Sequence, residues 1–187
     1  MNVVDALPDL AGTVKVTKGN LMLNRGLADT VNKITVTDGV LTLAEGVKIG
    51  KDAPLDGEVD LKDKGQLVLG GDLTLKELTT AEGSKITANG KTLTVNTAGN
   101  LTLNATVSGD LKLEMADGKT ADLKKDVNGT VGFESSTNGT ASLILAEGVH
   151  VDAVDFKTAD ADYKFFDLKL EGNAEIGRLR FAKTTDP

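Results

Sequence analysis

The sequence predicts an all-β protein, a parallel β-solenoid of short strands with Gly, Asn or Asp at its corners. Two repeats and the composition indicate this fold. A unit of glycine, one further residue and Leu-x-Leu occurs at 19–23, 39–43, 65–69, 71–75, 99–103 and 109–113. A second unit, Ala-Glu-Gly before a short alternating segment, occurs at 44–49, 81–86 and 146–151. With 21 Gly, 3% aromatic residues and no Trp, the core must be filled by aliphatic side chains.

Alternation of apolar and polar residues is typical of a strand with one buried face. The middle residues of the Leu-x-Leu units, such as Thr42, Thr74 and Thr102, are therefore expected to face solvent. The leucines should point inward and stack in columns: Leu41, Leu43, Leu73, Leu75, Leu101, Leu103, Leu111 and Leu113. Because glycine tolerates bends that a side chain resists, Gly46, Gly83 and Gly148 are expected at equivalent corners.

An antiparallel β-sandwich is the alternative fold. Its hairpins favour Asp-Gly and Asn-Gly turns, and the chain has such pairs, for example at 38–39 and 89–90. The interchangeable Leu-x-Leu units favour the solenoid, because like residues can stack on like from coil to coil. One short helix is expected at 25–34.

The chain divides into three predicted parts. Residues 1–11 are expected to form an N-terminal cap, 12–155 the solenoid, and 156–187 a C-terminal aromatic and acidic segment that acts as a cap or an interface. All six aromatic residues follow residue 132, and aromatic residues are enriched at interface hot spots. The candidate contacts with a second copy or a host structure are Phe156, Tyr163, Phe165, Phe166 and Phe181.

We expect no catalytic, cofactor-binding or metal-binding residue. His150, the only histidine, matches Lys48 in a repeated unit and should lie at the surface, with no nucleophile or carboxylate designated as its partner. An acidic group lacks the spacing of a calcium-binding loop and is expected to be solvated. Its members are Asp152, Asp155, Asp160, Asp162 and Asp167.

Charge and composition argue against several partners. A net charge of −7 with only three arginines does not suit a nucleic-acid partner. No run of 18 apolar residues is present, so no membrane span is expected. The absence of Cys excludes disulfides and thiolate zinc sites. No signal peptide is visible at the N-terminus, which favours a virion component among the extracellular alternatives.

The Gly-polar-Leu-Thr-Leu units and the segments LTLAEGVKI (41–49) and LILAEGVHV (143–151) resemble the right-handed β-helices of bacterial surface adhesins and phage tailspikes. The resemblance covers about residues 12–155. It implies a non-catalytic structural or adhesive protein of an extracellular, cell-surface or virion assembly, with the cytoplasm as an open alternative. Such a protein would self-associate into a homo-oligomer or polymer, and a host surface or polysaccharide is a further partner. The alternatives are a phage tailspike or head-decoration component, and a carbohydrate-binding or polysaccharide-cleaving β-helix protein.

Overall fold

Every strand pair in the described part of the chain is parallel. The structure, a computed structural model, describes residues 2–3, 12–24, 27, 31–49, 57–135, 140–158 and 166–183. No helix occurs among them. The solenoid prediction is therefore confirmed, and the antiparallel sandwich is wrong.

The strands form one long sheet and two shorter sheets. The long sheet has eleven strands: β1 (Asn2–Val3), β3 (Gly19–Leu23), β5 (Gly39–Leu43), β7 (Gln66–Leu69), β8 (Leu73–Leu75), β10 (Lys85–Thr97), β12 (Thr106–Met115), β14 (Val127–Ser135), β16 (His150–Thr158), β18 (Glu175–Ile176) and β19 (Leu179–Lys183). The N-terminal sheet has four: β2 (Gly12–Val16), β4 (Val31–Thr37), β6 (Glu58–Lys62) and β9 (Glu77–Thr80). The C-terminal sheet has β11 (Leu101–Leu103), β13 (Thr120–Leu123), β15 (Ala141–Leu145) and β17 (Phe166–Leu170).

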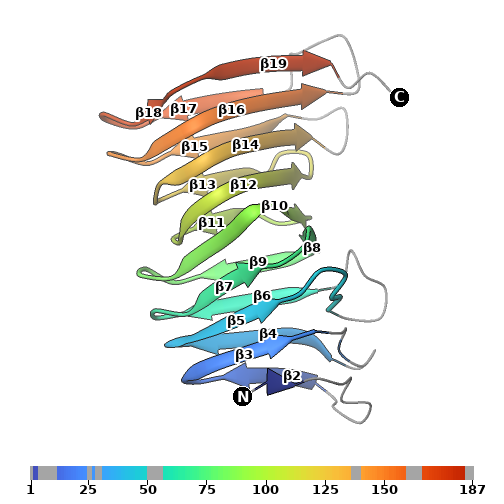
Figure 1. Ribbon diagram of the computed structural model, residues 1–187. Coiled ribbons are helices and arrows are strands. Elements are labelled where there is room, and N and C mark those ends of the chain that lie inside the picture. The colour runs from blue at the N-terminus through green and yellow to red at the C-terminus, as the bar shows by residue number, and fades with distance from the viewer. Residues whose placement is uncertain are drawn as a thin grey trace.

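The chain passes back and forth between the long sheet and a second face. Each pass adds a rung, and the rungs stack from β2 near the N-terminus to β19 near the C-terminus (Figure 1). The second face is the N-terminal sheet in the lower part of the rod and the C-terminal sheet in the upper part (Figure 1). The core lies between the two faces.

Strand register places the apolar side chains in columns along the rod. The eight leucines expected to point inward are all buried, none more than 6% exposed, whereas Thr42 and Thr74 are half-buried and Thr102 is exposed. One column spans the long sheet: Leu21, Leu41, Leu67, Ile86, Val107, Val127, Val151 and Ile176. The assigned inner and outer faces are confirmed.

The Ala-Glu-Gly corners are equivalent turns. Gly46, Gly83 and Gly148 have φ of 74°, 86° and 75°, in the left-handed region that glycine adopts without strain. In each turn the N–H after the glycine donates to the alanine carbonyl, at 3.1–3.2 Å. A fourth such turn occurs at Ala116–Lys119, where Lys119 N–H donates to Ala116 O at 3.2 Å and Gly118 has φ 67°. The prediction of equivalent corners is confirmed.

The polar second residue of the repeated unit connects successive coils. Asp72, Asn100 and Asp110 each accept a hydrogen bond through Oδ1 from the backbone N–H of the residue 20 positions later, at 2.8–3.0 Å. The donors belong to Thr92, Thr120 and Thr130. Each side chain thus satisfies a backbone donor in the strand above it, which explains why Asp or Asn follows the glycine in these units.

Two local expectations are corrected. The short helix expected at 25–34 is wrong over residues 31–34, because these residues belong to β4, which buries Val31, Ile34 and Val36 and pairs with both β2 and β6. The Asp-Gly pair at 38–39 and the Asn-Gly pair at 89–90 make no hairpins: Asp38 is the corner between β4 and β5, and the pair at 89–90 lies inside β10. Of the expected cap at 1–11, the structure describes Asn2–Val3, which pairs with β3.

Candidate functional site

Four phenylalanines form one cluster at the C-terminal end of the rod. Phe133 and Phe156 meet edge-on, with ring centroids 5.6 Å apart, and Phe166 lies 5.7 Å from the first and 5.0 Å from the second. Phe181 stacks on Phe156 at 5.4 Å. These rings come from β14, β16, β17 and β19, so consecutive rungs bring them together. Two further candidates, Tyr163 and Phe165, lie outside the described residues.

The rings of this cluster differ in exposure from the interior outward. Phe133 and Phe156 are 0% and 1% exposed, so in one copy of the chain they belong to the core. Phe166 is half-buried, and Phe181 is 55% exposed. Of the candidate interface residues that the structure describes, Phe181 therefore offers the most surface to a partner.

The last rung, which we call the C-terminal end, carries three exposed large apolar side chains. Leu170 on β17 is 46% exposed, and Leu179 and Phe181 on β19 are 44% and 55% exposed. Among the strands that the structure describes, β17 is the last of its sheet, and β18 and β19 each pair with β16 below them and with no other strand. An exposed sheet edge with apolar side chains is a template for pairing with another chain.

Charged side chains surround this end. Lys169 Nζ donates to Glu171 Oε1 at 2.8 Å, and this hydrogen bond lowers the pKa of Glu171 and raises the pKa of Lys169. Arg180 Nε lies 4.0 Å from Asp155 Oδ1. The C-terminal end is thus an apolar centre with a polar rim, the arrangement typical of protein interfaces.

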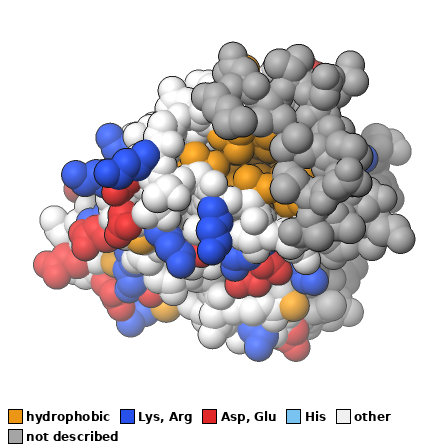
Figure 2. All heavy atoms as spheres, turned by 90° about the horizontal axis from the view of Figure 1, so that it is seen from below, with side chains coloured by type: hydrophobic (Ala, Val, Ile, Leu, Met, Phe, Trp, Pro, Cys, Tyr) orange, Lys and Arg blue, Asp and Glu red, His pale blue; other side chains and the backbone are white. Residues whose placement is uncertain are grey.

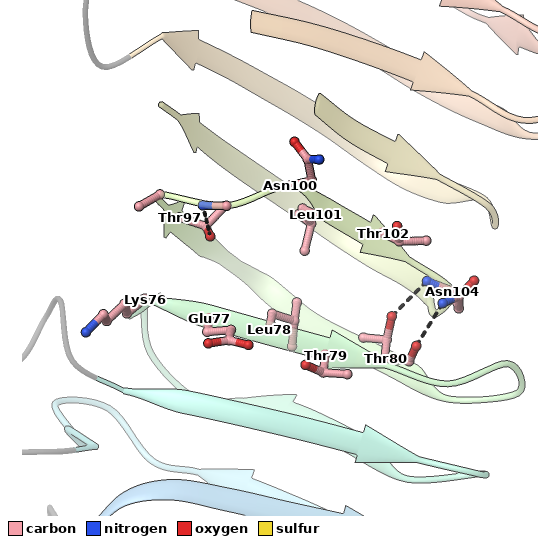
Figure 3. Close-up of a pocket in the computed structure, with 12 residues that line it drawn as sticks. Lys76, Glu77, Leu78, Thr79, Thr80, Thr97, Asn100, Leu101, Thr102 and Asn104 are labelled. Carbon is pink, nitrogen blue, oxygen red and sulfur yellow. Dashed lines mark hydrogen bonds between the residues drawn. The ribbon is translucent and has the colours of Figure 1, made fainter. Parts of the chain in front are cut away.

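A second feature, which we call the fissure, separates the two short sheets. β9 ends the N-terminal sheet and β11 begins the C-terminal sheet, and the two strands form no ladder with each other. The groove between them has a volume of about 420 Å³ and is lined by residues 76–80, 97–102 and Asn104. The fissure therefore interrupts the second face midway along the rod (Figure 3).

Asn104 and Thr80 close one end of the fissure. Asn104 Nδ2 donates to Thr80 O at 2.9 Å, and Asn104 N–H donates to Thr80 Oγ1 at 2.7 Å (Figure 3). The corner lengths explain the gap: Lys76 alone separates β8 from β9, whereas three residues, Ala98–Asn100, separate β10 from β11. The longer corner starts β11 away from β9.

The fissure combines polar and aliphatic residues and does not hold a catalytic pair. Thr79, Thr102 and Asn100 line it together with Leu78 and Leu101, whose side chains point toward each other from the two sides (Figure 3). Glu77 is the one carboxylate among the lining residues. Hydrolysis of a glycosidic bond uses two carboxyl groups on opposite sides of the bond, so the fissure does not provide that arrangement.

His150 lies on the upper rungs and is half-buried, as is Asp155, whereas Asp152 and Asp167 are exposed. His150 Nε2 lies 3.3 Å from Asp152 Oδ1, its Nδ1 lies 3.8 Å from Glu175 Oε2, and its backbone N–H donates to Asp126 Oδ1 at 2.8 Å. Carboxylates thus flank the imidazole on two sides, and no nucleophile lies among these contacts. Asp160 and Asp162 lie outside the described residues, and within the described ranges no group of three or more His, Asp or Glu could hold a metal ion.

The fold and its open C-terminal end define a class: a parallel β-solenoid, which is a repeat protein. None of the described segments is a helix long and apolar enough to cross a membrane. No family model, curated protein or solved structure matches the chain.

Proposed function

We propose that the chain is a non-catalytic structural protein that self-associates through its C-terminal end. One observation carries the proposal. Leu145 and Phe156 in the rung below are at most 1% exposed, whereas Leu170 and Phe181, which stack directly above them, are 46% and 55% exposed. Side chains at these column positions are therefore buried in the rung below and exposed to solvent in the last rung.

Covering these positions supplies the driving force for association. Full burial of a Leu or Phe side chain contributes about 1.5–3 kcal/mol, so covering the exposed half of each contributes about 1 kcal/mol. The outer edges of β17 and β19, which pair with no further strand among the described residues, add main-chain hydrogen bonds to the contact. The apolar centre supplies affinity, and the ion pairs at the rim restrict how two copies can approach.

The setting that we propose for this protein is an extracellular bacterial or viral assembly, in which the rod spaces or adheres. This setting rests on the resemblance of the repeated units to those of adhesins and tailspikes. A polysaccharide-cleaving activity receives no support from the fissure, which has a single carboxylate.

The test is the mass of the protein in solution, measured by light scattering over a wide range of concentration. The wild type should exceed the mass of one chain, 19.5 kDa, and the double variant Leu179→Ser/Phe181→Ser should not. Met22→Ser is the matched control, because Met22 is also an exposed apolar residue, at 38%, but lies on the side of the rod. A wild type that stays monomeric, or a double variant that associates like the wild type, contradicts the proposal.

A further inference from the structure

We infer that the rod has a second conformation in which the fissure is closed, with β9 and β11 paired in one ladder, and that the Thr80 hydroxyl is the latch that keeps them apart. This inference goes beyond the proposed function and does not depend on it, because it concerns the middle of the rod. Residues 76–80 and 97–104, which form both walls, are all described. At the N-terminal end, in contrast, hydrophobic side chains at the surface lie against atoms that are not described (Figure 2).

The hydrogen bonds between Asn104 and Thr80 differ from those of the rungs above. In the C-terminal sheet, the residue that follows a strand donates its backbone N–H to the carbonyl of the last residue of the strand below, at 2.9–3.0 Å. The pairs are Lys124 with Leu103, Ala146 with Leu123 and Glu171 with Leu145. Asn104 follows β11 in the same way, but its N–H donates to Thr80 Oγ1 at 2.7 Å, and its Nδ2 donates to Thr80 O at 2.9 Å. Two side-chain groups thus replace one main-chain hydrogen bond.

This contact already sets the register of a ladder between the two strands. When Asn104 N–H donates to Thr80 O, as in the other rungs, Leu103 lies beside Thr80 and Leu101 beside Leu78. Leu78 and Leu101 already point toward each other across the fissure, and each is 4% exposed (Figure 3). Closure therefore requires no sliding of one strand along the other.

Both walls carry main-chain groups that this ladder would pair. Alternate residues of a parallel strand direct N–H and C=O to the same neighbouring strand. Since Thr80 O and Asn104 N–H face each other's strand, so do the main-chain groups of Leu78 and Thr102, two residues earlier. β9 and β11 form no ladder, so these groups depend on water in the open form. In the closed form Thr102 N–H donates to Leu78 O, and Thr80 N–H donates to Thr102 O.

The corner at residues 98–100 absorbs the movement. Gly99 in this corner is exposed, and its N–H donates to Thr97 Oγ1 at 3.1 Å. A Cβ at Gly99 would meet one atom within 4 Å, that same oxygen at 3.7 Å, so no packed neighbour holds the corner in place. A few residues of this kind suffice as a hinge. An inserted strand from another chain does not fit as the occupant, because Thr80 and Asn104 are already within hydrogen-bond distance of each other.

The test is a disulfide between the two walls in a chain that has no Cys of its own. Glu77 and Asn100, both exposed, become register partners at the wide end of the fissure when it closes. A disulfide needs Cα atoms within about 7 Å, and neighbouring strands lie about 4.8 Å apart. Glu77→Cys/Asn100→Cys is oxidised in a glutathione buffer, and the bridged fraction is followed by mass spectrometry after alkylation of free thiols.

Two further pairs calibrate the rate of bridging. Glu58 and Glu77 are register partners of the permanent ladder between β6 and β9, so Glu58→Cys/Glu77→Cys should bridge fastest. Glu58→Cys/Asn100→Cys spans two strand spacings even in the closed form and should not bridge. Glu77→Cys/Asn100→Cys should bridge at a rate between the two. If it bridges no faster than the pair that spans two spacings, the fissure does not close and the inference is overturned.

The latch is tested in the same background. Thr80→Val removes the hydroxyl, so Asn104 N–H keeps only the carbonyl as acceptor, and bridging should accelerate about 2- to 10-fold, the equivalent of one neutral hydrogen bond. Thr80→Ser keeps the hydroxyl and should leave the rate unchanged; equal rates in the two variants overturn the role of Thr80. Hydrogen exchange of the wild type needs no variant. The Thr102 amide should exchange more slowly than in an unstructured chain, yet faster than the amide of Asp122, its register partner in the rung above, and an unprotected Thr102 amide also overturns the inference.

Discussion

Phe133→Ala should be among the most damaging single substitutions in this chain. The side chain is 0% exposed, and its ring meets those of Phe156 and Phe166 edge-on at 5.6 Å and 5.7 Å. Truncation of a buried Phe to Ala costs about 3–5 kcal/mol, and the lost edge-on contacts, worth about 0.5–1.5 kcal/mol per pair, place this site in the upper part of that range. Against a typical stability of about 5–15 kcal/mol, such a loss is large.

Phe181→Ala is the matched comparison, because it removes the same side chain from the same cluster. Phe181 is 55% exposed and stacks on Phe156 at 5.4 Å. Less than half of its surface is buried within one copy, so the expected loss is about 1 kcal/mol. In a self-associated protein the loss should grow with concentration, since the partner copy then buries the remainder.

Guanidinium unfolding followed by far-ultraviolet circular dichroism measures both losses, since the chain has no Trp for fluorescence. The two variants should be compared at the lowest usable concentration, where association contributes least. The reasoning is refuted if Phe181→Ala destabilises the protein as much as Phe133→Ala, because burial would then not determine the contribution of a ring. A changed slope of the transition in Phe133→Ala would indicate that the upper rungs unfold separately.

Three further predictions concern the rungs, the corners and the charges. Leu103→Ala should cost about 2–5 kcal/mol in chemical unfolding and the exposed neighbour Thr102→Ala less than about 1 kcal/mol; equal losses would reverse the assigned faces. Gly148→Ala, at φ 75°, should lower thermal stability by about 1–2 kcal/mol, whereas Gly132→Ala, whose added methyl group meets no atom closer than 3.8 Å, should not. Partial burial lowers the pKa of Lys112, but Glu114 and Glu134 together raise it above its ordinary value. The stabilising contribution of the Lys112 charge is therefore present at neutral pH and is lost as the pH rises through the raised pKa. When urea unfolding is measured at increasing alkaline pH, Lys112→Gln should lose less stability than the wild type, and equal losses would contradict this.

The sequence predicts the rungs well because their signal is local. Alternation within each Leu-x-Leu unit fixes which side chains are buried, and the glycine of each Ala-Glu-Gly corner reflects a backbone conformation that other residues resist. The same reasoning fails at Val31–Ile34, where the spacing suits a helix but pairing with β2 and β6 stabilises a strand. The Ala-Glu-Gly motif does not predict the fourth corner, at residues 116–119, because Asp117 replaces the glutamate there.

The fissure and the exposure of the last rung could not be predicted in this way. The fissure depends on a difference in length between the corner at Lys76 and the corner at Ala98–Asn100, which has meaning only when the coils are stacked. The sequence predicts Phe156, Phe166 and Phe181 as members of one C-terminal aromatic segment, but it does not predict that Phe133 joins them. Which ring is covered depends on which rung lies above it. Phe156 is covered by Phe181 and Phe166, and Phe181 belongs to the last rung.

The break between β9 and β11 also determines how the rod would respond to mechanical load. A pull along its long axis is carried by two faces through most of the molecule, but at the level of β10 the long sheet alone runs on without interruption. On the opposite side the load falls on the two hydrogen bonds between Asn104 and Thr80 and on the exposed ion pair of Lys125 with Glu82, at 3.0 Å. Under tension the rod should therefore bend away from the fissure before either half gives way, with the long sheet as the hinge.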